Sequence, residues 1–75
     1  MIDREWFHDV YQGDDAGAVD RARGLVWCEV PSSRHRFTHI RHVETVGGIG
    51  VWYCYGSDTY HFSDEEGTAC GRQSK

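Results

Sequence analysis

The sequence predicts an α+β fold in which an N-terminal helix packs on an antiparallel β-meander of three or four strands. Two observations lead to this fold class. Apolar residues recur at helical spacing before Gly13, and β-branched and aromatic residues separated by turn signals fill the stretch from Gly24 to Ser63. A chain of 75 residues suits a single domain, and a domain this small buries only about 60–65% of its unfolded surface. We expect one compact domain over residues 1–63 and a flexible polar tail over residues 64–75.

The first predicted helix covers residues 4–12, with Asp3 as its N-cap and Gly13 as its C-terminal stop. Residues 14–24 are ambiguous, because Asp15 can cap a short helix while two glycines suit a loop equally well. We favour a weak helix of two turns there. The first helix would form one side of the core with its apolar stripe: Trp6, Phe7, Val10 and Tyr11.

Strands are predicted near residues 24–30, 34–46, 49–55 and 59–63, where β-branched and aromatic side chains are enriched. The turns between them are Pro31-Ser32-Ser33, Gly47-Gly48 and Gly56-Ser57-Asp58. Because side chains alternate along a strand, the sheet would have two partly apolar faces. One face would hold Val26, Cys28, Val30, His35, Phe37, His39, Val43, Trp52, Cys54 and His61. The other would hold Leu25, Trp27, Ile40, Val51, Tyr53, Tyr55, Tyr60 and Phe62. One short helix covers only one face, so the other would meet solvent, a partner or a second copy in a homodimer.

Charge is distributed in blocks along the chain, which has a net charge of −4. Residues 1–20 hold six acids and one base, residues 21–43 hold five bases and one acid, and residues 44–66 hold five acids and no Lys or Arg. The overall acidity disfavours direct nucleic-acid binding, which normally has a basic footprint. It favours a protein partner with a basic surface.

These features favour a small acidic, non-enzymatic protein-binding module that inhibits or regulates its partner. Carboxylates in turns and tail would imitate the phosphate spacing of nucleic acid, and exposed aromatics would anchor the contact. Small acidic chains without a recognisable motif are typical of the inhibitors that phages and mobile elements encode against host defence nucleases, the anti-CRISPR proteins included. The predicted partner-binding residues are Asp14, Asp15, Asp58, Asp64, Glu65, Glu66, Trp27, Tyr53, Tyr55 and Tyr60.

A second hypothesis is a zinc-stabilised domain. The stretch Leu25 to Cys28 leading to His35 and the stretch Val51 to Cys54 leading to His61 repeat one pattern at an offset of 26 residues. Two equal hairpins would place each Cys opposite a His, and the four candidate ligands would be Cys28, His35, Cys54 and His61. Structural zinc sites usually take ligand pairs from tight turns with roughly two to four intervening residues. We therefore expect no cofactor, with zinc as the alternative.

A third hypothesis is single-stranded nucleic-acid binding. Here bases would stack on Trp27, Tyr53, Tyr55 and Tyr60, beside the cationic segment formed by Arg34, His35, Arg36, His39, Arg41 and His42. An enzyme is not expected, because the sequence offers no Gly-rich phosphate loop and no nucleophile that can be placed with a base and a cleft.

The sequence also indicates a cytoplasmic protein. The N-terminal residues lack the apolar stretch of a signal peptide. The longest apolar run, Ile49 to Tyr55, has seven residues, whereas a membrane span needs about 20. An odd number of cysteines, three, is typical of reduced thiols rather than of a secreted disulfide framework.

Overall fold

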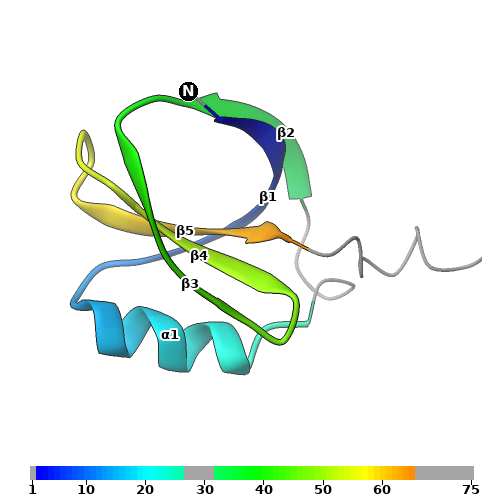
Figure 1. The fold of residues 1–75 in the computed structure, drawn as a ribbon, viewed down its shortest axis with the longest axis vertical. Coiled ribbons are helices and arrows are strands. Elements are labelled where there is room, and N and C mark those ends of the chain that lie inside the picture. The colour runs from blue at the N-terminus through cyan, green and yellow to red at the C-terminus, as the bar shows by residue number, and fades with distance from the viewer. Residues whose placement is uncertain (1, 27–31, 66–75) are drawn as a thin grey trace, which may run out of the picture.

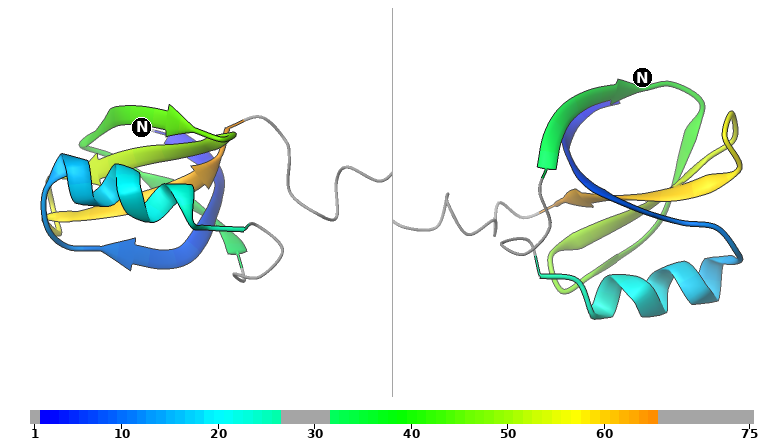
Figure 2. Two further views of the ribbon diagram at one scale, coloured as in Figure 1. Left: turned by 90° about the horizontal axis from the view of Figure 1, so that it is seen from below. Right: turned by 180° about the vertical axis from the view of Figure 1, so that it is seen from behind.

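A computed structural model of the chain describes residues 2–26 and 32–65. It is a five-stranded antiparallel sheet with one short helix packed on one side (Figures 1 and 2). The elements in chain order are β1 (Ile2–Tyr11), α1 (Asp15–Arg23), β2 (Ser32–Phe37), β3 (Ile40–Val46), β4 (Ile49–Cys54) and β5 (Thr59–Asp64), and the strand order in the sheet is β2-β1-β5-β4-β3. The prediction of an N-terminal helix on a three- to four-stranded meander is wrong. Only β3, β4 and β5 form the meander.

The segment predicted as the first helix is strand β1. Trp6 and Phe7 are adjacent in sequence and only 1% and 3% exposed, which a strand achieves because neighbouring side chains point to opposite faces. β1 pairs with β2 on one side and β5 on the other, with a register shift between Trp6 and Val10. Trp6 and Val10 belong to one face of β1 and Phe7 and Tyr11 to the other, and these two alternating sets together resemble a helical spacing. Val10, assigned to the helix core, is 48% exposed.

The helix favoured over residues 14–24 is confirmed as α1. Its N-cap is Asp14 rather than Asp15, since the Asp14 carboxylate accepts a hydrogen bond from the Gly17 N–H at 2.8 Å. Arg21 and Arg23 lie in the last turn, where positive charge complements the helix dipole. The helix buries Ala18, Val19 and Ala22 against the sheet.

The sheet curls until its two edge strands meet at one end. β2 and β3 lie at opposite edges, yet only Thr38 and His39 connect them, and the sheet curves round the side that faces away from α1 (Figure 1). His39 has a φ of 56°, which ends β2 and turns the chain. The His39 carbonyl then accepts a hydrogen bond from the Tyr55 N–H at 3.1 Å. The single strand predicted over residues 34–46 is divided here.

The curl creates two apolar layers. On the outer face α1 covers a cluster of Phe7, Ala18, Ala22, Ile49, Val51, Tyr60 and Phe62. On the inner face the Trp6 ring lies 4.8 Å from the Phe37 ring and 6.0 Å from the Trp52 ring, centroid to centroid. Fully burying a side chain of this size contributes roughly 1.5–3 kcal/mol. The inner layer is therefore a second core, which supplements the small one beneath the helix.

Two details of the predicted strands need correction. Val43, predicted on the face of Trp52, packs against the outer cluster, because the turn at Thr38 and His39 changes which face the next strand presents. His42 pairs with Trp52 on the inner face, so its neighbour Val43 points to the outer face. Residues 24–26 of the predicted first strand are not a strand, and its remaining residues, 27–30, lie outside the described part of the chain. Leu25 packs against the outer cluster.

Candidate functional site

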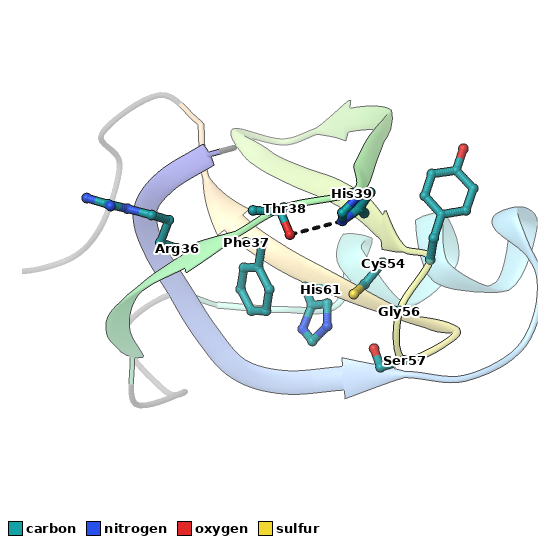
Figure 3. A pocket seen from close by; sticks show the side chains of 9 residues that line it. Arg36, Phe37, Thr38, His39, Cys54, Gly56, Ser57 and His61 are labelled. Atoms are coloured by element: carbon teal, nitrogen blue, oxygen red, sulfur yellow. Dashed lines mark hydrogen bonds between the residues drawn. The ribbon is translucent and has the colours of Figure 1, made fainter.

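A cleft of about 640 Å³ lies where the curled sheet opens between the β2–β3 connection and the β4–β5 turn (Figure 3). Phe37 and His61 form one wall, and their rings stack at a centroid distance of 4.6 Å although β1 separates their strands. Cys54, the last residue of β4, directs its sulfur into the same space (Figure 3). The complete lining is Arg36, Phe37, Thr38, His39, Cys54, Tyr55, Gly56, Ser57 and His61.

The turn after β4 folds back beside the Cys54 side chain. The Asp58 N–H donates to the Cys54 carbonyl at 2.9 Å, and Asp58 has a φ of 57°, so the chain folds back over the cysteine. Burial raises the pKa of the Cys54 thiol, but hydrogen bonds from the Ser57 hydroxyl and from the backbone N–H groups of Ser57 and Gly56 outweigh this, and the net pKa is lowered.

The hydroxyl groups of Ser57 and Thr59 connect this turn to the imidazole of His61. The Ser57 and Thr59 hydroxyl oxygens are 2.6 Å apart, and the Thr59 hydroxyl oxygen is 3.2 Å from Nε2 of His61. Burial, together with the nearby positive charge of His35, holds the pKa of His61 below its usual value of 6.5. A neutral His61 with its proton on Nε2 donates to Thr59. Ser57, Thr59 and His61 therefore form one connected polar group beside Cys54.

The chain matches no protein-family model, no curated protein and no solved structure. Within the described residues, no helix has the length and apolar character required to cross a membrane.

Only part of the predicted zinc set comes together. His35, Cys54 and His61 share the inner face, as predicted, but Cys54 pairs with Thr59, and His61 pairs with Trp52. His35 pairs with Arg4 of β1, and Cys28 lies outside the described residues. Among the described residues no group of three or more His, Cys, Asp or Glu side chains is placed to hold a metal ion.

Several predicted partner-binding carboxylates are engaged inside the fold. Asp14 caps α1, Asp15 accepts from Tyr60 and pairs with Arg41 at 3.4 Å, and Asp58 accepts from Tyr53. Asp64 ends β5. Glu65, the next residue, contacts Arg4, Trp52 and Ser63 through its carboxylate. Glu66 lies outside the described residues. Four of the described acids, Asp14, Asp15, Asp58 and Glu65, therefore each have a partner within the chain.

The predicted aromatic anchors also separate. Tyr60 is 4% exposed under α1, and Tyr53 is partly buried beside it, with the Arg41 guanidinium 5.5 Å from its ring centroid. Tyr55 is 57% exposed and lines the cleft. Trp27 lies outside the described residues. Of the described aromatic set, Tyr55 alone lines the cleft, and its ring packs against that of Tyr53 at a centroid distance of 5.0 Å.

Sequence reasoning missed Phe37, Ser57 and Thr59 as members of a site. The turn signal Gly56-Ser57-Asp58 was visible in the sequence, and a turn directly after a cysteine can present backbone N–H groups to its sulfur. The contact between Phe37 and His61 depends on the curl of the sheet, for which the sequence contains no local signal.

Proposed function

We propose that the protein is a non-enzymatic binding module that takes an apolar side chain of a partner protein into the cleft. The observation that carries this proposal is the cleft itself, whose volume of about 640 Å³ falls within the usual range of roughly 300–1,000 Å³ for binding pockets. Its walls combine Phe37 with the polar groups of Cys54 and His61, and such a mixture suits an apolar anchor with a few directed hydrogen bonds.

Exposed Tyr55 at the edge of the cleft favours a protein as the ligand. It is 57% exposed, more than the other large hydrophobic side chains of the described residues. Exposed tyrosines beside a pocket are common binding hot spots in protein interfaces. The net charge of −4 favours encounter with a basic partner, while contact is made by the cleft. That the partner is inhibited, and that it is a host defence nuclease, stay predictions from the sequence.

The proposal can be tested by filling the cleft. A Cβ at Gly56 meets nothing closer than the Cys54 sulfur at 3.9 Å, so Gly56→Phe introduces a ring at the cleft without a clash at its base. Gly24→Phe is a matched control, because a Cβ at Gly24, after the end of α1, is 3.7 Å from its nearest neighbour, the Arg21 carbonyl oxygen.

The measurement is capture of a partner from lysate of the source cell or its host, followed by titration of the captured protein with each variant. We expect Gly56→Phe and Tyr55→Ser to weaken binding about tenfold or more, since a lost anchor typically costs 1–2 kcal/mol or more. Gly24→Phe should bind like the unaltered chain. Equal binding by all three folded variants would show that the cleft does not hold the partner.

A further inference from the structure

We propose that His61, together with His35 and His8, forms a pH switch that keeps the curled sheet closed at neutral pH and loosens it on acidification. The switch would act with or without a partner in the cleft. The chain has five histidines, and all of them lie on the inner side of the sheet or at the cleft: His8, His35, His39, His42 and His61.

Three of these imidazoles belong to the aromatic packing of the inner layer. The ring centroid of His61 lies 4.6 Å from that of Phe37 and 6.3 Å from that of Trp6. The His35 ring lies 6.0 Å from the Phe37 ring and 6.0 Å from the His8 ring. Imidazoles from β1, β2 and β5 therefore take part in one continuous series of ring contacts.

The stack of Phe37 on His61 depends on the curl, because β1 lies between their two strands. The same two rings form one wall of the cleft (Figure 3). His61 is half-buried, so a protonated ring in this position would lack part of the hydration that a charge requires. Protonation of His61 therefore favours separation of the two rings and a more open cleft.

Titratable or charged side chains reach this side from every strand and from the β2–β3 connection: Arg4 and His8 of β1, His35 of β2, His39 of the connection, His42 of β3, Cys54 of β4, and Glu65 after β5. The Arg36 guanidinium points away from the cleft (Figure 3). The Glu65 carboxylate is already paired with Arg4 at 2.7 Å. Acidification therefore adds positive charge to a side on which this carboxylate is engaged.

Two acids close in sequence to these histidines contact the outer side of the fold instead. Asp9 binds Arg21 of α1 at 2.7 Å, and Asp58 accepts from Tyr53, which packs against the outer cluster. Burial, and then the positive charge of His35, lower the pKa of His61 from its usual value of 6.5. This direction agrees with an imidazole that faces other imidazoles rather than a carboxylate.

The sign of the pH effect follows from that direction. A histidine whose pKa is lowered in the folded state contributes stability that is complete above 6.5 and is lost as the pH falls below this value, because the open chain then binds more protons. Acid should therefore loosen the curl where these rings meet, before it affects the packing of α1 on the outer face.

The experiment measures native-state hydrogen exchange of the full chain by NMR at about pH 7 and about pH 5, expressed as protection factors. The reporter is the Tyr55 N–H, which donates to the His39 carbonyl at the end of the curl, and the reference is the Leu25 N–H, which donates to the Ala22 carbonyl beside α1. We expect protection at Tyr55 to fall about threefold or more at the lower pH while protection at Leu25 is retained. Unchanged protection at Tyr55, or an equal loss at both amides, would overturn the proposal.

Variants assign the effect to particular imidazoles. His61→Phe keeps a ring that can stack on Phe37 but cannot be protonated, and it should remove most of the acid-induced loss at Tyr55. His35→Gln changes an exposed residue; the pKa of His61, followed by NMR, should rise toward 6.5, and the loss at Tyr55 should shrink.

His42→Gln is the matched control. His42 lies on the same side, but its ring contacts Trp52 at 4.7 Å and its Nε2 lies 2.9 Å from the Thr45 hydroxyl oxygen. This variant should keep the acid response of the unaltered chain. An unchanged response in His35→Gln and in folded His61→Phe, or its loss in His42→Gln, would refute the assignment to His61 and His35.

Discussion

The Tyr60 side chain shows how a single residue joins helix α1 to the sheet. It is 4% exposed between α1 and the sheet, and its hydroxyl donates to the Asp15 carboxylate in the first turn of the helix. Arg41 of β3 binds the same carboxylate at 3.4 Å. Burial of the phenol and the adjacent Asp15 charge raise the pKa of Tyr60 to about 12.

Alkaline pH should weaken this junction. A group whose pKa is higher in the folded state contributes stability that is complete below its unfolded value, here 10.0, and that is lost as the pH rises toward about 12. Tyr60→Phe should cost about 1 kcal/mol at neutral pH through loss of the hydrogen bond. The difference in unfolding free energy between the two proteins should then shrink above pH 10.0. Urea unfolding monitored by circular dichroism at a series of pH values checks this; a constant difference would contradict it.

At the scale of elements, α1 depends on its cap and its ion pairs because its apolar face is small. Only Ala18, Val19 and Ala22 are buried. Arg21 binds the Asp9 carboxylate of β1 through two nitrogens, at 2.7 and 3.0 Å. A helix of nine residues is marginal by itself, so the cap at Asp14 should have a measurable effect on stability.

Removing that cap should destabilise the protein without changing the sheet. Asp14→Ala leaves the Gly17 N–H without its acceptor and should cost about 1 kcal/mol, whereas Asp14→Asn retains a capping oxygen and should cost a few tenths. Both variants lose the same charge, so a difference between them isolates the cap. Equal unfolding midpoints in denaturant would indicate that the charge of Asp14, not its hydrogen bond, stabilises α1.

The same elements show what the sequence could predict and where it failed. Local sequence signals predicted helix α1, which is followed by its C-cap Gly24, and the hairpin turn at Gly47-Gly48. Helix caps and glycines with positive φ depend only on a few neighbouring residues, so both can be recognised in the sequence. β1 was misassigned, since its identity depends on pairing with β2 and β5, which are distant in sequence. The cleft was not predictable either, because Phe37 and His61 come together only after the sheet has curled. Cys54 and His61 were placed on the correct face, but the predicted register was wrong by two residues, because His61 lies opposite Trp52.

For the molecule as a whole, Glu65 fastens three strands at the inner layer. Its carboxylate accepts from the Trp52 indole N–H of β4 and the Ser63 hydroxyl of β5, each at 2.9 Å, and pairs with Arg4 of β1 at 2.7 Å. The Arg4 guanidinium also lies 5.2 Å from the Trp52 ring centroid. These contacts depend on Gly50, because a Cβ at that position would overlap the Glu65 side chain.

A double-mutant cycle tests whether these contacts of Glu65 stabilise the curled sheet. Gly50→Ala should displace Glu65 and cost about 1–3 kcal/mol. Glu65→Ala should cost a similar amount, because Arg4 loses its ion pair and the Ser63 hydroxyl loses its acceptor. Since both changes remove the same contacts, the double variant should cost less than the sum by about 1 kcal/mol or more. Gly56→Ala, whose Cβ meets nothing within 3.9 Å, is the matched glycine control and should change stability by about 0.5 kcal/mol or less. Strict additivity in the unfolding free energies would mean that Gly50 and Glu65 act separately, and that the curl of the sheet is maintained by the packing of Trp6, Phe37 and Trp52 alone.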